Sequence, residues 1–233
     1  MKILVLTACL GEGTVVASTK QEGFYSGINP VVYNTVDEVV VTDKDFPPRL
    51  KAMTSRLQAK IPKMLGYQLY PGYDYYIWKD ANISFQKSNT ADWLVSRCGF
   101  AHAAFFRHSA RSRIQDEADF IEQVMARGDP YLVNRYSGEP MQEQVKHYKA
   151  NPLFSDNRLF ECGVFVYKKE VITKSAPNIL EQWFYHCARW SVNDQLSLPY
   201  VLSNNQDYIV NTIDKNIFGN EYTFYHSAHR KIT

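Results

Sequence analysis

Short apolar runs alternate with amphipathic segments along this chain, and polar residues follow directly where the apolar runs stop. Residues 2–9 predict a buried strand, and residues 38–42 predict a second one. Residues 49–65 carry apolar side chains on one helical face, and we expect Pro62 to end or kink this helix. The aromatic residues 75–78 predict a third strand, so the first third of the chain follows an α/β pattern.

The rest of the chain continues this alternation. Helices are predicted over residues 90–97, 116–127, 141–150, 177–190 and 194–202, and strands over residues 101–106, 159–167 and 222–225. Gly163 lies inside one of these strands, which indicates that another part of the chain closely approaches its backbone. No linker or repeat interrupts the pattern. We therefore predict one α/β domain, residues 1–233, with a GT-A-like (Rossmann-like), mostly parallel central sheet and helices on both faces.

The composition is that of a globular protein, with 45% hydrophobic and 21% charged residues. A net charge of +2 is too small to indicate nucleic-acid binding. The four cysteines are scattered without a C-x-x-C spacing, so neither a zinc site nor a disulfide framework is predicted. The first apolar run is too short for a signal peptide, and no segment is long enough to span a membrane. We therefore expect a soluble, cytoplasmic protein.

Asp80 and Asn82 follow the aromatic strand at the point where its hydrophobicity stops. In open α/β sheets, ligands bind at the carboxyl ends of the strands. Carboxylate and amide oxygens there suit Mg²⁺ or Mn²⁺ that bridges to a diphosphate. The alternative is an Asx turn that only closes the strand, since both residue types are common in turns.

Other polar residues also stand at the ends of predicted elements. They are Asp43, Arg107, His108, Arg111, Asp194, Gln195, His226 and His229. Glu161 instead lies within an apolar strand, where a buried carboxylate needs a partner, and we predict Arg107 or Arg111. Simpler roles are open for the rest: a solvated helix start for the arginine-rich segment, surface histidines near the C-terminus, and a helix N-cap for Asp194 or Asn193. As a helix-start residue, Asp194 is expected to tolerate replacement by Asn with near-wild-type melting.

Five segments, in order, resemble a GT-A-like group of glycosyltransferase-like proteins found in bacteria and plants. They are Lys60-Ile61-Pro62-Lys63, Tyr76-Ile77-Trp78-Lys79-Asp80, Arg107-His108-Ser109-Ala110-Arg111 followed by Glu117, Glu161-Cys162-Gly163-Val164, and Asp194-Gln195-Leu196-Ser197. More distantly, Asp80-Ala81-Asn82 is similar to the Asp-x-Asp motif of GT-A glycosyltransferases. The Asp-Gln pair resembles one in glycogenin-like and galactosyltransferase-like retaining enzymes. The resemblance extends over nearly the whole chain.

This resemblance implies a metal-assisted glycosyltransferase that uses a nucleotide sugar, with a UDP-sugar favoured. The acceptor is left open as a glycan, a protein or a modified nucleic acid, and so is the choice between retention and inversion. The implied roles are catalysis for Asp194, Gln195 and Glu161; donor binding for Thr7, Ala8, Asp43, Lys60, Lys63, Asp80, Arg107 and Arg111; and binding of Mn²⁺ or Mg²⁺ for Asp80, Asn82 and His226. Since Asn82 replaces the second Asp of the motif, metal affinity is expected to be weaker.

Two other functions are open from the sequence. A nucleotidyltransferase usually has a Gly-rich loop with Arg and Lys directly after the first strand, whereas here no basic residue occurs between Gly11 and Lys20. A non-catalytic nucleotide-sugar-binding protein of the same fold is favoured by Asn82. Binding without transfer, tested across a panel of nucleotide sugars, would distinguish the second alternative from an enzyme.

Overall fold

The computed structural model describes residues 1–11, 14–23, 34–50 and 53–227. In these ranges six strands form a central sheet in the order β2-β1-β3-β6-β5-β7. Their bounds are β1 (Lys2–Cys9), β2 (Thr35–Thr42), β3 (Tyr75–Lys79), β5 (Ala103–Arg107), β6 (Phe160–Lys168) and β7 (Val210–Ile213). The short strands β4 (Ile83–Phe85) and β8 (Thr223–Tyr225) pair with each other in a separate antiparallel ribbon.

All strands of the central sheet except β6 point in one direction. β1 is parallel to β2 and β3, and β5 is parallel to β7. β6 lies between β3 and β5 and is antiparallel to both. The expected mostly parallel sheet is confirmed, with one reversed strand at its centre. As a result, the amino end of β6 lies at the same edge of the sheet as the carboxyl ends of its neighbours.

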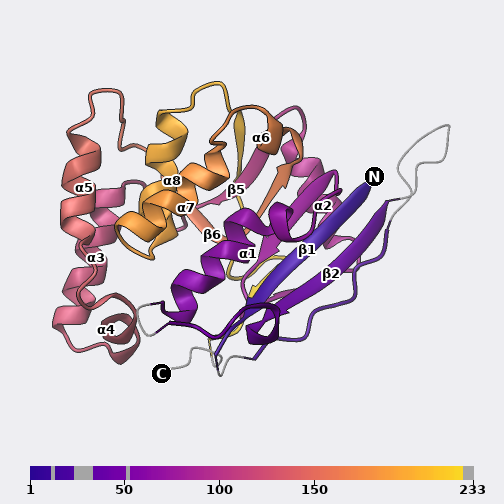
Figure 1. Ribbon diagram of the computed structural model, residues 1–233, viewed down its shortest axis with the longest axis horizontal. Coiled ribbons are helices and arrows are strands. Elements are labelled where there is room, and N and C mark those ends of the chain that lie inside the picture. Colours follow the sequence, from indigo (N-terminus) through magenta and orange to yellow (C-terminus); the bar gives the residue numbers. More distant parts are fainter. Residues whose placement is uncertain (12–13, 24–33, 51–52, 228–233) are drawn as a thin grey trace.

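Helices cover both faces of the sheet, as predicted. Their bounds are α1 (Ser55–Leu69), α2 (Thr90–Cys98), α3 (Ile114–Ala126), α4 (Pro130–Tyr136), α5 (Met141–Lys149), α6 (Glu170–Thr173), α7 (Ile179–Arg189) and α8 (Asp194–Ser203), with a 3-10 turn at Asp43–Asp45. α1, α7 and α8 pack on one face, and α2 packs on the other together with β4. α3 and α5 form a third apolar cluster with α8, and Figure 1 shows α3, α4 and α5 gathered at the side of the molecule away from β2.

Alternation along β1 supplies both layers of the core. Leu4 and Leu6 pack on the side of α1 and α7, whereas Ile3 and Val5 pack on the side of α2. None of these four side chains is more than 2% exposed, so the predicted buried strand is confirmed. β2 was expected to be buried as well, but only Val41 in it is fully buried. β2 lies at the edge of the sheet and packs mainly against β1, which leaves four of its eight residues exposed.

α1 begins later and ends later than its apolar pattern predicted. The Thr54 side chain accepts a hydrogen bond from the N–H of Leu57 and starts the helix there, while Leu50 lies outside it and is 79% exposed. Pro62 does not end the helix, which continues to Leu69. The backbone departs from helical geometry at Leu65 (φ −109°, ψ 18°), so the chain kinks after the proline.

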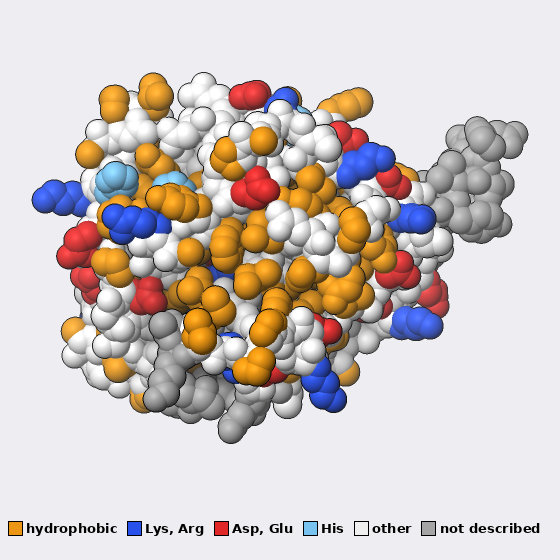
Figure 2. All heavy atoms as spheres, viewed as in Figure 1, with side chains coloured by type: hydrophobic (Ala, Val, Ile, Leu, Met, Phe, Trp, Pro, Cys, Tyr) orange, Lys and Arg blue, Asp and Glu red, His pale blue; other side chains and the backbone are white. Residues whose placement is uncertain are grey.

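The surface seen in Figure 2 has apolar side chains across its centre, where Figure 1 draws α1, α7 and β1, and charged side chains mostly toward the periphery. Within the part of the chain described above, none of the helices has both the length and the hydrophobicity needed to cross a membrane.

Candidate active site

A cavity of about 900 Å³ opens at the sheet edge where β1 and β3 end and β6 begins. Its walls come from one face of α1, the loop after β5, helices α3 and α4, and the first residues of α8. The volume is within the range of small-molecule sites, roughly 300–1,000 Å³. The reversed direction of β6 matters here, because it places Glu161 at this edge beside the carboxyl end of β5.

Most of the residues assigned to the site from sequence lie around this cavity. Those that line it are Ala8, Lys60, Lys63, Asp80, Asn82, Arg111, Glu161, Asp194 and Gln195. They come from segments up to 187 positions apart in the sequence, and the fold brings them to one place.

The other assigned residues do not line it. Thr7 is buried inside β1, and Arg107 forms an exposed ion pair with Asp214 at 2.6 Å. Asp43 lies one residue beyond β2, where it accepts the N–H of the cavity residue Gly11 at 2.7 Å. The imidazole Nε2 of His226 forms a hydrogen bond with the Ser84 hydroxyl at 2.8 Å. His229 lies outside the described residues.

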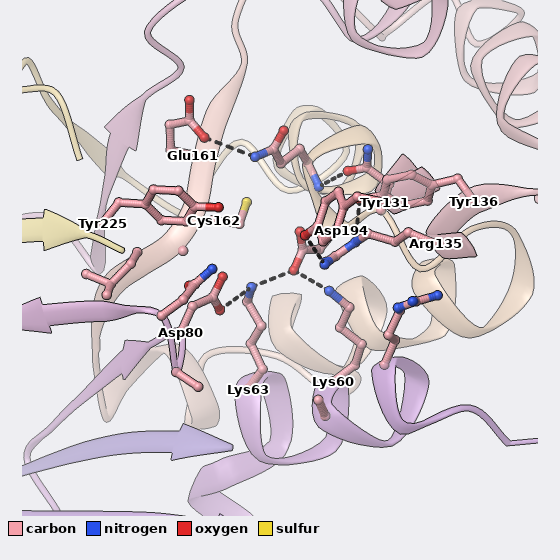
Figure 3. A pocket seen from close by; sticks show the side chains of 18 of the residues that line it. Lys60, Lys63, Asp80, Tyr131, Arg135, Tyr136, Glu161, Cys162, Asp194 and Tyr225 are labelled. Atoms are coloured by element: carbon pink, nitrogen blue, oxygen red, sulfur yellow. Dashed lines mark hydrogen bonds and ion pairs between the residues drawn. The ribbon is translucent and has the colours of Figure 1, made fainter. Parts of the chain in front are cut away.

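An alternating chain of charges forms the floor of the cavity (Figure 3). The ammonium nitrogens of Lys60 and Lys63 each lie 2.6 Å from Oδ2 of Asp194, and Lys63 Nζ is also 3.5 Å from Oδ1 of Asp80. Asp194 is 7% exposed and both lysines are 5% exposed. Burial alone would raise the pKa of Asp194, but the two lysines outweigh it and hold this pKa well below its usual range. Asp194 is therefore ionised at neutral pH.

The local structure of α8 allows this arrangement. The N-cap is Asn193, whose side chain accepts the N–H of Gln195 at 3.0 Å. Asp194 is thus the first helical residue rather than the cap, and its carboxylate is free to bind the lysines. On α1, the spacing of Lys60 and Lys63 puts both ammonium groups on the face that lines the cavity.

Asp80 is held at the end of β3 with part of its carboxylate open to the cavity. The indole N–H of Trp78 donates to its Oδ1 at 2.6 Å, and the Asp80 side chain is still 39% exposed. The backbone carbonyl of Asn82 accepts a hydrogen bond from the backbone N–H of His226 at 2.9 Å, so Asp80, Asn82 and His226 lie in one region. Among the described residues, His, Cys, Asp and Glu form no cluster of three that could hold a metal ion. Asp80 and Asn82 nevertheless fit Mg²⁺ or Mn²⁺, which take hard oxygen ligands and fill further positions with water and phosphate.

Glu161 is buried at the start of β6, but the prediction that it pairs with an arginine is wrong. Arg111 binds Glu117 instead. The Glu161 carboxylate accepts hydrogen bonds from Gln195 Nε2 at 3.1 Å and from the backbone N–H of Ser109 at 3.4 Å. Both donors are neutral. Sequence spacing placed the arginines near Glu161 but could not tell which carboxylate each would reach.

The surroundings of Glu161 raise its pKa to about 7, mainly through burial and further through the negative charge of Glu117. His108 lies 3.5 Å away but does not neutralise it, because burial and the charge of Arg111 lower the pKa of His108 to about 4. Nδ1 of His108 accepts the N–H of Arg111 at 3.0 Å, which leaves the imidazole proton on Nε2, facing Glu161. Glu161 can therefore gain or lose a proton near neutral pH.

One wall of the cavity was not predicted from the sequence. α4 contributes Tyr131, Arg135 and Tyr136, and α1 contributes Arg56. The Arg135 guanidinium donates to the Tyr136 hydroxyl at 2.9 Å and to the Tyr131 hydroxyl at 2.8 Å. The start of α4 had a readable signal, since the Asp129 side chain caps the helix and Pro130 is its first residue.

Gly163 supports Asp80 from the neighbouring strand. A Cβ at this position would lie 2.8 Å from Ile83 Cδ1 and 3.4 Å from Asp80 Oδ2, which confirms the close approach expected from the sequence. Gly163→Ala should therefore force the buried Ile83 side chain out of its position and destabilise the protein by about 1–3 kcal/mol. Denaturant unfolding measures this. Gly219→Ala is the control, because a Cβ there has nothing within 4 Å, and equal losses in both variants would contradict the steric explanation.

Comparisons with known proteins identify a family and show a distant structural likeness. The model of the family described as TOD1/MUCI70, glycosyltransferase-like domain, matches residues 39–224, well over half of the chain. No curated protein sequence matches. Among solved structures, the apo form of mouse xyloside xylosyltransferase 1 is similar at 10% identity and a TM-score of 0.47, covering 92% of this chain and 86% of that one.

Proposed function

We propose that this chain, which belongs to the TOD1/MUCI70 glycosyltransferase-like domain family, transfers a sugar from a nucleoside-diphosphate sugar to an acceptor hydroxyl. One observation carries the proposal: a partly exposed carboxylate, Asp80, lies next to the buried Lys63 in the same cavity as Glu161, a carboxyl group with a pKa near 7. The first group suits a diphosphate, and the second suits proton transfer. A UDP-sugar is the favoured donor.

The leaving diphosphate needs positive charge on its oxygens. A Mg²⁺ or Mn²⁺ ion held by Asp80 and Asn82 would supply it as a Lewis acid. His226 is the proposed third ligand, although its imidazole would first have to release the Ser84 hydroxyl. Lys63, already 3.5 Å from Asp80, is placed to donate to the same phosphate oxygens.

Asp194 has a supporting part in this proposal. Two ammonium groups surround its single carboxylate, so the cluster of Lys60, Lys63 and Asp194 is positive overall. Such a cluster favours the departing anion more than the positive anomeric carbon. We therefore assign Asp194 to holding the lysines in position, with Gln195 next to it in contact with Glu161.

Glu161 is the proposed base. As the acceptor oxygen bonds to the anomeric carbon and the bond from that carbon to the diphosphate breaks, the hydroxyl proton passes to the Glu161 carboxylate. A group with a pKa near 7 is suited to this step, because it is partly ionised at neutral pH and can still hold the proton afterwards. A protein that only binds nucleotide sugars has no need for such a group, which favours catalysis.

Thermal unfolding with UDP, in the presence and absence of Mn²⁺, tests the donor site. UDP and Mn²⁺ at a hundred times the dissociation constant should stabilise the wild type by about 2.7 kcal/mol. Asp80→Ala should lose this gain and keep its fold, because the Asp80 side chain is 39% exposed. The control is Asp214→Ala, whose carboxylate is 68% exposed and lies outside the cavity. An unchanged UDP–Mn²⁺ response in Asp80→Ala would remove Asp80 from the site.

A further inference from the structure

Arg56 and Arg135 line the same cavity and face each other from α1 and α4. Arg56 Nη1 donates to the backbone carbonyl of Asn134 at 2.7 Å. Arg135 donates to the hydroxyls of Tyr131 and Tyr136, and its guanidinium lies 5.7 and 5.4 Å from the centres of their rings. Within the described ranges, neither arginine forms an ion pair with a carboxylate.

The remaining cations of the cavity are compensated in a different way. Lys60 and Lys63 share Asp194, and Arg111 binds Glu117. The carboxyl group of Glu139 acts on the pKa of Arg56 only through its charge at a distance. Glu139 instead accepts a hydrogen bond from the backbone N–H of Val192 at 2.9 Å. Burial and the like charge of Arg135 both lower the pKa of Arg56. The two guanidinium groups therefore repel each other beside a cavity large enough to admit a ligand.

Their position separates them from the diphosphate region. Arg56, Lys60 and Lys63 follow one another at helical spacing along the cavity face of α1. Lys63 is the member next to Asp80, and Arg56 is seven residues before it, about 10 Å along the helix axis. A ligand that reaches Arg56 therefore lies farther along α1 than a phosphate bound at Lys63 beside Asp80.

Arg135 feels the negative charges of Asp194 and Asp80 only at a distance, and Arg56 that of Glu139, so an anion that reaches both guanidinium groups can still bind favourably. Guanidinium groups bind carboxylate and phosphate oxygens through paired N–H donors. The tyrosine hydroxyls already fix the orientation of Arg135, so less freedom is lost when it binds. We infer that Arg56 and Arg135 form a subsite for an anionic group, a carboxylate or a phosphate, on the acceptor. Only the assignment of this anionic group to the acceptor rests on the proposed function.

Calorimetric titration tests the subsite. The probes are glucuronate, inorganic phosphate and uncharged glucose, each titrated with UDP and Mn²⁺ present so that the diphosphate region is occupied. Glucuronate or phosphate should bind the wild type at least tenfold more tightly than glucose, and the tighter of the two identifies the anion as carboxylate or phosphate. Arg56→Gln and Arg135→Gln should each weaken that binding at least tenfold and change the affinity for UDP and Mn²⁺ less than threefold.

Arg113→Gln is the matched control, because Arg113 is exposed and does not line the cavity. Arg56→Gln keeps the test valid if loss of Arg135 loosens α4. Equal binding of anions and glucose, or unchanged anion binding in both cavity variants, would overturn the subsite. Loss of UDP binding in the arginine variants would overturn it too, by placing the pair at the donor diphosphate. Anion binding that depends on the arginines, without any binding of UDP, would instead contradict the proposed function and support the subsite.

Discussion

Asp194→Asn is expected to lower the free energy of unfolding by about 3–5 kcal/mol and sugar transfer by on the order of a hundredfold. The variant keeps the shape of the side chain but removes the negative charge that both Lys60 and Lys63 contact. Two buried ammonium groups then repel each other and no longer hold their positions for the diphosphate. Denaturant unfolding and a transfer assay measure the two effects. The loss of stability replaces the near-wild-type melting expected from a helix-start residue.

The matched control is Asp214→Asn, which breaks an ion pair that is 62% and 68% exposed and should change stability by less than about 1 kcal/mol. Lys60→Met combined with Asp194→Asn should recover part of the loss, because the repulsion between the two lysines is removed and Lys63 still lies 3.5 Å from Asp80. Since the pKa of Asp194 is depressed in the folded protein, its stabilisation is present at neutral pH and is lost as the pH falls below about 4. Wild-type melting in Asp194→Asn would show that the lysines do not depend on this carboxylate.

Glu161→Gln should reduce sugar transfer by roughly 10²–10⁴-fold, because the amide cannot accept the acceptor proton. In the wild type, transfer should rise with pH and level off above about 7, where Glu161 becomes ionised. The variant should lack this rise. The pH–rate profile therefore separates proton transfer by Glu161 from a purely packing role, and an unchanged profile in Glu161→Gln would exclude Glu161 as the base.

Glu161→Gln should also gain stability over the wild type, and this gain should be larger in alkaline than in acidic buffer. A carboxyl group whose pKa rises from 4.5 to about 7 on folding costs stability as the pH increases through that interval. The cost reaches about 3 kcal/mol above pH 7, and Gln removes it. An arginine-paired Glu161 would have given the opposite sign. Glu122→Gln, an exposed change outside the cavity, should keep wild-type transfer.

Local patterns were sufficient to predict the strands that end at the cavity and several of its charged residues, whereas Lys60 and Lys63 were assigned to it through the family resemblance. Asp80, Asn82 and Asp194 were found because polar residues stand where apolar runs stop, and that boundary is a property of a few neighbouring positions. The prediction of an arginine partner for Glu161 was wrong, because the pairing depends on how far each side chain reaches across the cavity. Arg135 was missed for another reason: no element was predicted between the helices at residues 116–127 and 141–150, although Asp129 and Pro130 start α4 there.

Strand direction is a further property that local patterns do not contain. The run that became β6 was predicted as a strand, yet nothing in its residues distinguishes a parallel from an antiparallel neighbour. Its reversal decides that Glu161, near the amino end of β6, belongs to the cavity edge. Had the strand followed the parallel pattern, its carboxyl end at Lys168 would have lain there instead.

The central place of β6 also has a consequence for synthesis on the ribosome. β3 ends about 80 residues before β6 begins, so at 5–20 residues per second it waits roughly 4–16 s for its partner. During that interval the nascent sheet β2-β1-β3 exposes the unpaired backbone of an apolar strand, which is a site for wrong pairing. β6 therefore closes this vulnerable edge and brings Glu161 to the cavity in the same event.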